Sequence, residues 1–199
     1  SRARAEGTPL SQGLAPNDPW AVDYKGEFLL ADKRYCYPLT VTDYASRYLL
    51  LCEAMESNRE ELAFRAFERL FQERGLPQAI RSDNGVPFAS PNSLFNLSKL
   101  SVWWLRLGIS IERIRPGHPQ QNGRHERMHL TLKQEATRPA GANLLQQQAK
   151  FDDFLDSLKK AHEKDKATLT VYDRGMLDLE KRFGKYSMIR DSFSPVPIG

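Results

Sequence analysis

Three short stretches near the start of the chain carry the residue pattern of β-strands. Residues 20–24 alternate in character, which places Trp20 on one face of a strand and Asp23 on the other. Residues 35–43 and 48–55 are rich in aromatic, β-branched and other apolar side chains. The links between the three stretches are short, so we predict an antiparallel meander.

After this meander the pattern changes to an alternation of helices and strands. Residues 57–75 and 93–107 carry apolar side chains at helical spacing, and a glycine ends each stretch. Strand patterns follow over residues 79–82 and 109–114. This order predicts an α/β domain in which helices pack on a mixed sheet.

The next part of the chain predicts a loop and two further helices. Residues 115–122 are polar and rich in Pro, Gly, Gln and Asn, and they lead into a helix that Pro139 ends. Residues 143–160 have an apolar stripe at helical spacing. Beyond residue 165 the pattern is weak, with one possible short helix over residues 176–183.

The composition narrows the class of protein. A hydrophobic content of 40% and a charged content of 27% fit a soluble globular chain. There is no apolar run of about 18 residues and no secretory signal, so we expect no membrane span. Two cysteines, Cys36 and Cys52, suit a reducing compartment such as the cytoplasm. The net charge of +4 permits nucleic-acid binding without proving it.

Three carboxylates stand where α/β folds gather polar groups. Asp23 leaves the first strand, Asp83 follows the fourth, and Glu126 lies on the helix after the fifth. Clustered acids repel one another unless a cation neutralises them, and hard divalent ions prefer oxygen ligands. Taken alone, each acid also has an ordinary role, as a solvent-facing strand residue, a turn former or a first-turn helix acid.

The helix that carries Glu126 contains a competing motif. His125 to His129 match HExxH, which in zinc peptidases places two histidines on one helix face with the glutamate as general base. The flanking residues are polar and basic, and the only third ligand in view is the distant Glu163. A zinc metallopeptidase therefore stays as an alternative interpretation.

Four motifs in fixed order decide between these interpretations: WAVDYKG, TVTDYASRY, IRSDNGVPFAS and PGHPQQNGRHERMHLTLKQE. Residues 17–135 thereby resemble the catalytic core of DDE transposases of bacterial insertion sequences, which are related to retroviral integrases. The resemblance implies a ribonuclease-H-like fold with a five-stranded mixed sheet. It also implies Mg²⁺ or Mn²⁺, two ions with DNA bound, held by Asp23, Asp83 and Glu126. The implied reaction is DNA strand cleavage and strand transfer, by a homodimer or higher oligomer assembled on DNA near the nucleoid.

The chain departs from the family pattern in three places. The interval between Asp83 and Glu126 is longer than in many relatives, and residues 90–104 absorb the difference. Residues 1–19 are too short for the helix-turn-helix region with which such transposases bind transposon ends. After residue 154 the chain lacks the Arg-Pro-His-like segment of relatives. A catalytically inactive DNA-binding remnant of a transposase is therefore a second alternative.

Polar and basic side chains near the acids indicate how DNA would bind. Lys and Arg neutralise phosphates without reading sequence, although a solvated helix face of mixed charge is the ordinary alternative. We expect Asp43 to support the site without binding metal. The candidate DNA-binding residues are Lys25, His118, Gln121, Asn122, Arg124, Arg127, His129 and Lys133.

The same patterns divide the chain into four predicted segments. Residues 1–16 are an N-terminal arm or linker, and residues 17–140 are the integrase-type catalytic core. Residues 141–165 form a C-terminal helix packed on or extending the core, and residues 166–199 are a divergent, loose tail.

Overall fold

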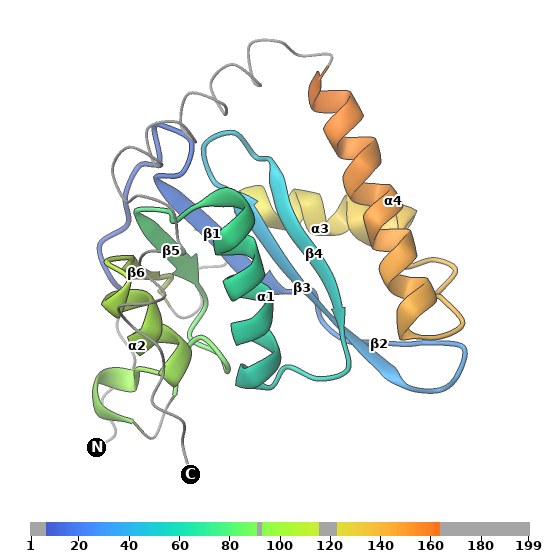
Figure 1. Ribbon diagram of the computed structural model, residues 1–199, viewed down its shortest axis with the longest axis horizontal. Coiled ribbons are helices and arrows are strands. Elements are labelled where there is room, and N and C mark those ends of the chain that lie inside the picture. Colours follow the sequence, from blue (N-terminus) through green and yellow to red (C-terminus); the bar gives the residue numbers. More distant parts are fainter. Residues whose placement is uncertain (1–6, 91–92, 116–122, 164–199) are drawn as a thin grey trace.

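The computed structural model describes residues 7–90, 93–115 and 123–163, with the backbone alone at residues 94, 123–127 and 162–163. Figure 1 shows its helices gathered around one twisted sheet. The elements are β1 (Pro19–Tyr24), β2 (Phe28–Leu29), β3 (Tyr35–Asp43), β4 (Leu49–Met55), α1 (Glu60–Arg74), β5 (Ala79–Ser82), the 3₁₀ turn η1 (Leu94–Asn96), α2 (Lys99–Arg106), β6 (Ser110–Arg113), α3 (Gly123–Glu135) and α4 (Leu144–Glu163).

The sheet is mixed, as the sequence predicts. β3 pairs antiparallel with β1, β2 and β4, and β5 lies parallel to both β1 and β6. The path through the sheet is β2-β3-β1-β5-β6, with β4 on the other side of β3. The α/β fold class and the antiparallel meander are confirmed. The sheet has six strands instead of the expected five, because the two residues of β2 form an additional hairpin with β3.

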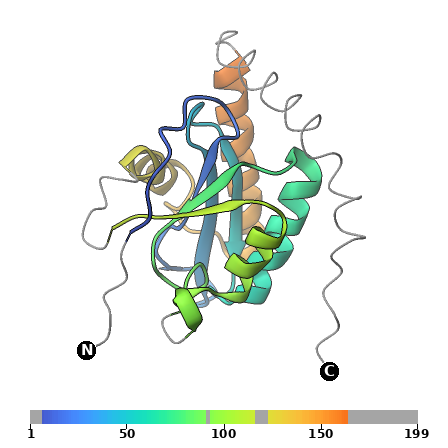
Figure 2. The same cartoon turned by 90° about the vertical axis from the view of Figure 1, so that its left-hand side faces the viewer.

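Strand alternation gives the sheet two different faces, which Figure 2 shows edge-on with α3 on one side and α1 and α2 on the other. On the α1–α2 face, Trp20 and Val22 of β1 and Ile80 of β5 pack against buried aromatic residues of the helices, including Phe67 and Trp104. Alternate residues point to the opposite face. There, over β3 and β4, a second core joins Leu49 and Cys52 to Leu132 of α3 and Phe151 of α4. We call this second side the α3 face.

One predicted helix begins later than the periodicity suggested. Apolar spacing indicated a helix from residue 93, but the chain makes the 3₁₀ turn η1 and begins α2 at Lys99. The Ser98 hydroxyl accepts a hydrogen bond from the Ser101 amide, which is the contact of an N-cap. Phe95 and Asn96 have φ angles of 55° and 54°, outside the right-handed helical range. Local capping therefore outweighs the helical spacing of the leucines.

Residues 7–18 run along the sheet and bind it at several points. The Thr8 amide donates to the carbonyl of Arg113 at 3.1 Å, and the Arg113 amide donates to the Thr8 hydroxyl at 2.7 Å. Further along, the Asn17 amide donates to the Asp43 carboxylate at 2.6 Å. Thr8 of the predicted arm or linker, residues 1–16, is thus hydrogen-bonded to β6, and Asn17 at the start of the predicted core is hydrogen-bonded to β3.

Two further predictions can be compared with the structure only over the described residues. Within residues 7–163, apart from the two gaps, no helix is both long enough and apolar enough to span a membrane. The tail over residues 166–199 and the short helix over residues 176–183 lie outside the described residues. The helix over residues 143–160 is confirmed as α4.

Candidate active site

Asp23 and Asp83 occupy equivalent positions at the ends of neighbouring parallel strands. The last registered pair between β1 and β5 joins Ala21 to Arg81, and each aspartate stands two residues further along its own strand. Parallel strands bring their carboxyl ends to one edge of a sheet, and residues two apart share a face. Both aspartates therefore lie at the carboxyl ends of these paired segments, and Asp23, the partner of Thr40 in the register, lies on the α3 face.

The turn after β5 fixes one oxygen of Asp83. The Gly85 amide donates to Asp83 Oδ1 at 3.0 Å, and a Cβ at position 85 would lie 3.0 Å from Asp83 Oδ2. The ordinary interpretation of Asp83 as a turn former is thus correct for one of its oxygens. Arg113 lies close by: burial lowers the pKa of its guanidinium, while the charge of Asp83 opposes that shift.

α3 approaches Asp23 through the side chain of His129. His129 Nδ1 lies 3.7 Å from Asp23 Oδ2, and His129 Nε2 lies 2.7 Å from the Thr40 hydroxyl. Thr40 donates its single hydroxyl proton to the Asp23 carbonyl at 3.0 Å. The Thr40 hydroxyl thus bridges the backbone of Asp23 and the ring of His129, and the tautomer of the ring decides which atom donates in the Thr40–His129 bond.

Burial keeps this histidine neutral at pH 7. The His129 side chain is 11% exposed, and burial, followed by the charge of Lys25, lowers its pKa to about 4. The pKa of Lys25 is itself lowered, first by burial and then by the charge of Lys133, whereas Asp23 opposes the change. The structure therefore gathers Asp23, Lys25, His129 and Lys133 into one cluster, as the sequence predicts.

A family model described as "Integrase core domain" matches residues 13–119, which is just over half of the chain. The chain belongs to the integrase core domain family. A second model with the same description matches residues 107–162.

Similar proteins come from insertion elements and retroviruses. The "Insertion element IS476 uncharacterized 39.2 kDa protein" of Xanthomonas euvesicatoria is 30% identical over 61% of this chain and 33% of its own length. The Gag-Pol polyprotein of avian reticuloendotheliosis virus is 29% identical over 62% of this chain and 10% of the polyprotein. The chain thus spans a third or less of these two relatives.

Solved integrase structures share the fold. A chain of the simian T-cell lymphotropic virus intasome superposes with a TM-score of 0.55 at 20% identity, covering 69% of this chain and 46% of that one. The HTLV-2 integrase catalytic core in complex with magnesium superposes with a TM-score of 0.50 at 19% identity, covering 64% and 74%. The ribonuclease-H-like architecture implied by the motifs is therefore confirmed.

The remaining predicted site residues of this integrase core are only partly described. Glu126 lies within α3, three residues before His129, and helical geometry makes positions three apart neighbours on one face. Its side chain is outside the described part of the structure, as are those of Arg124 and Arg127. His118, Gln121 and Asn122 lie outside the described residues altogether. The metal-binding and DNA-binding roles of all these residues stay predictions.

The zinc interpretation receives no support from the described side chains. His129 Nε2 already contacts Thr40, so this nitrogen is engaged within the protein. Among the described residues, no three His, Cys, Asp or Glu side chains lie close enough together to hold a metal ion. The side chain of His125, the other histidine of the motif, is outside that set, as is Glu126.

The sequence analysis missed a buried ion pair behind the two aspartates. Arg81 Nη2 lies 2.7 Å from Glu112 Oε2, and the two side chains are only 2% and 7% exposed. Ser11 hydrogen-bonds to both partners: its amide donates to Glu112, and its carbonyl accepts from Arg81. Tyr44 stacks on the same guanidinium, with 4.2 Å between the guanidinium carbon and the ring centroid. Only the strand register, which aligns Arg81 with Glu112, reveals this contact.

Asp43 holds the backbone around it, while its predicted support of the site stays a prediction. It is fully buried, and its carboxylate accepts hydrogen bonds from the Asn17 amide and from both the amide and hydroxyl of Ser46. Burial raises the pKa of this carboxyl group above its ordinary value. These contacts join residues 7–18 to the turn between β3 and β4.

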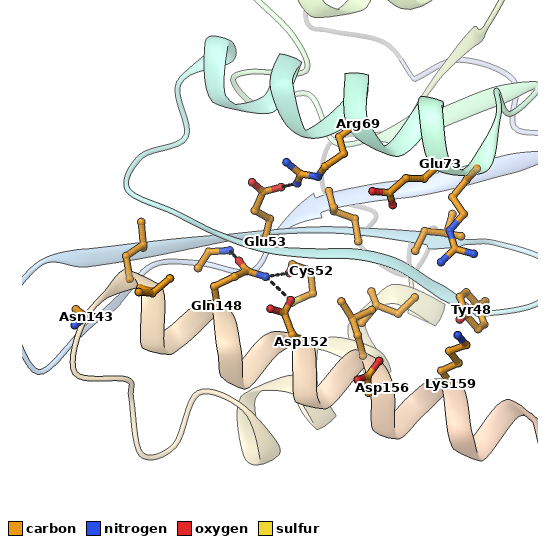
Figure 3. A pocket seen from close by; sticks show the side chains of 18 of the residues that line it. Tyr48, Cys52, Glu53, Arg69, Glu73, Asn143, Gln148, Asp152, Asp156 and Lys159 are labelled. Carbon is orange, nitrogen blue, oxygen red and sulfur yellow. Dashed lines mark hydrogen bonds and ion pairs between the residues drawn. The ribbon is translucent and has the colours of Figure 1, made fainter. Parts of the chain in front are cut away.

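A wide groove lies away from Asp23 and Asp83. It has a volume of about 1000 Å³ and runs along β4 between α1 and α4. Figure 3 shows Glu53 of β4 paired with Arg69 of α1, and Gln148 of α4 bonded to β4. Gln148 accepts from the Ala54 amide and donates to the Cys52 carbonyl. The Gln148 side chain thereby satisfies hydrogen-bonding groups of the β4 backbone at the edge of the sheet. We therefore do not assign a catalytic role to this groove.

Proposed function

We propose that this integrase core is the catalytic domain of a transposase, which cleaves DNA strands and joins the freed 3′-hydroxyl to target DNA. The observation that carries the proposal is the equivalent placement of Asp23 and Asp83 on parallel neighbouring strands. The helix that contains Glu126 packs beside Asp23 through His129. The insertion-element relatives indicate transposon ends and target DNA as substrates, in the bacterial cytoplasm.

The donor set fits a divalent metal. Asp23 and Asp83 supply hard carboxylate oxygens at one edge of the sheet, and Glu126 would be the third acid. These residues would hold Mg²⁺ or Mn²⁺, with two ions in the DNA complex. Bound ions would supply activation of the attacking hydroxyl and stabilisation of the leaving oxygen.

The protein's own residues have three roles in this proposal. The Gly85 amide and the Thr40 hydroxyl hold the turn of Asp83 and the backbone of Asp23 in place. Lys25 and Lys133 bring positive charge next to Asp23, where it neutralises DNA phosphate. Arg124, Arg127 and the loop residues His118, Gln121 and Asn122 extend this DNA contact along α3 and the segment before it.

We also propose that the chain acts as a dimer or a higher oligomer on DNA. Support comes from the related integrase structures, one described as an intasome and another as a trimeric form. Size-exclusion chromatography with light scattering, with and without DNA, tests this proposal. A monomer-to-DNA ratio of one in the complex would contradict it.

The catalytic proposal is tested with branched DNA duplexes that mimic a strand-transfer product. The arms vary in sequence across a pool, because the transposon end is unknown. The parent chain should resolve the branch with Mg²⁺ or Mn²⁺ and not with EDTA. Asp23→Asn, Asp83→Asn and Glu126→Gln should each lower the rate by about 10³-fold or more.

Asp153→Asn is the matched control, because Asp153 is an exposed acid on α4 and should leave the rate unchanged. Equal rates for Asp83→Asn and the parent chain would refute the catalytic assignment. A parent chain that binds DNA without resolving any branch would instead favour the inactive DNA-binding remnant. Metal-dependent peptide hydrolysis would favour the zinc alternative.

A further inference from the structure

The buried side of α3 combines apolar residues with one histidine. Leu132 and Ala136, which directly follows the helix, are both buried in the second core. His129 lies three positions before Leu132, so helical geometry places it on the same side of α3. Among the described side chains of α3, His129 is the buried one nearest to Glu126. Apolar packing thus accounts for the C-terminal half of the helix, and a polar residue is buried nearer to Glu126.

The ring of His129 contacts two strands of the sheet. Its Nε2 atom lies 2.7 Å from the Thr40 hydroxyl of β3, and its Nδ1 atom lies 3.7 Å from Asp23 Oδ2 of β1. Thr40 is fully buried, and its hydroxyl also donates to the Asp23 carbonyl at 3.0 Å. The register of β1 and β3 places Asp23 opposite Thr40. The three residues therefore form a chain of contacts from α3 to the strand that carries Asp23.

Packing alone does not require a histidine at this position. A buried polar group costs free energy unless it is hydrogen-bonded. A leucine would continue the apolar side of α3 without that cost. Instead, both ring nitrogens of His129 face polar groups of the candidate site, one at Thr40 and the other at Asp23. The choice of residue therefore indicates a role in the geometry of the acids.

The same contacts favour a role towards Asp23 over the DNA contact that we predicted for His129. Only 11% of its side chain is exposed, and its Nε2 atom is engaged by Thr40. Phosphate contacts come from donors that reach the surface, and Lys133, four positions further along α3, is exposed. A ring enclosed between a helix and a sheet is better placed to hold these two elements together.

We propose that His129 is a positioning residue, which anchors α3 on Thr40 and thereby sets the separation of the Asp23 and Glu126 carboxylates. The inference rests on the proposed function, in which both acids hold divalent metal. Glu126 lies one helical turn before His129, so the anchor fixes the part of α3 that carries the third acid. Mg²⁺ requires near-ideal octahedral geometry, so its affinity depends on how closely the carboxylates are held in place.

The test measures the binding of Mn²⁺ to the full chain without DNA, by electron paramagnetic resonance of the free ion. The parent should bind Mn²⁺, and Asp23→Asn should weaken this binding. His129→Leu keeps the buried side of α3 apolar but loses both ring contacts. It should raise the dissociation constant for Mn²⁺ by about 10-fold or more, as is typical when a residue that supports metal-binding groups is lost. Its denaturation midpoint at pH 7 in EDTA should equal or exceed that of the parent.

Two further variants separate the Thr40 contact from a general effect of substitution. Thr40→Val removes only the hydroxyl and should also weaken Mn²⁺ binding. Its combination with His129→Leu should add little, because both changes break the same contact. His129→Gln places an amide within reach of Thr40 and should restore most of the affinity. Leu130→Ala is the matched control, since Leu130 is a 57% exposed neighbour of His129 on α3 and should leave Mn²⁺ binding unchanged.

The outcomes distinguish this inference from the proposed function. Equal Mn²⁺ affinity in His129→Leu and the parent would overturn the inference and leave the catalytic proposal intact. Weaker DNA binding by His129→Leu in EDTA, measured by fluorescence anisotropy, together with unchanged Mn²⁺ affinity, would assign the residue to DNA instead. A parent that binds no Mn²⁺ would also overturn the inference. Equal branch resolution by Asp23→Asn and the parent would refute the proposed function itself.

Discussion

The two faces of the sheet are built from the same strands but hold different kinds of side chain. On the α1–α2 face, aromatic rings from the helices pack against Trp20, Val22 and Ile80. On the α3 face, alternate residues of the sheet include the buried Arg81–Glu112 pair and the candidate acid Asp23. A one-residue alternation thus lets short strands stabilise the fold on one side and present polar groups on the other.

The largest expected loss of stability is on the α1–α2 face. Phe71 is fully buried, and its ring centroid lies 5.4 Å from that of Trp103 and 6.0 Å from that of Trp20. Phe71→Ala should lower the free energy of unfolding by about 3–5 kcal/mol, measured by denaturant titration. Phe95→Ala, which truncates an exposed ring, should change it by less than about 0.5 kcal/mol. Similar losses in both variants would contradict this view of the core.

A loss of about 3 kcal/mol is expected when the buried ion pair is broken. Glu112→Ala leaves the charge of Arg81 buried without its partner and also removes the acceptor of the Ser11 amide. The double variant Arg81→Met with Glu112→Leu should recover most of the lost stability, because it leaves no buried charge. Denaturant titration of both variants measures the difference. A double variant less stable than Glu112→Ala would show that the pair stabilises the face directly.

The smallest expected effect is a pH dependence from His129. An unfolded histidine has a pKa of 6.5, whereas burial lowers the pKa of His129 in the fold to about 4. The unfolded chain therefore binds a proton in this interval that the folded chain does not. The free energy of unfolding should be fully developed above pH 6.5 and fall by roughly 2 kcal/mol as the pH drops to 5.

Thermal or denaturant unfolding of the metal-free protein in EDTA measures this fall. His129→Asn removes the titrating ring and should flatten the profile across the same interval. His162→Asn replaces another histidine of α4, far along the chain from His129, and should leave the slope unchanged. A slope that persists in His129→Asn would assign the effect to other groups.

Much of the fold could be predicted because it depends on local patterns. Alternation around Trp20 predicts the face on which Asp23 lies, and the parallel pairing of β1 with β5 is consistent with the edge that we predicted it to share with Asp83. β2 was missed because two residues are too few to show a period. The start of α2 was wrong because leucine spacing continued through a segment where the Ser98 cap governs the backbone.

The sequence could predict that four titratable residues of the candidate site lie together, but it could not predict the contacts that support the site. Motif order brought Asp23, Lys25, His129 and Lys133 together, and the structure gathers these four side chains. The Arg81–Glu112 pair depends on a register between strands, so no local pattern contains it. The binding of residues 7–18 likewise depends on single hydrogen bonds between distant parts of the chain, and such bonds have no sequence period.

Thr8 has a practical consequence for handling the protein. Its two hydrogen bonds occupy the outward-facing amide and carbonyl of Arg113, on the strand that ends the β2-β3-β1-β5-β6 path. An uncovered strand edge readily pairs with another chain and begins aggregation. A truncation that starts at residue 13, where the family match begins, would uncover this edge. Such a shortened protein should precipitate or form strand-paired oligomers at concentrations where the longer chain stays dispersed.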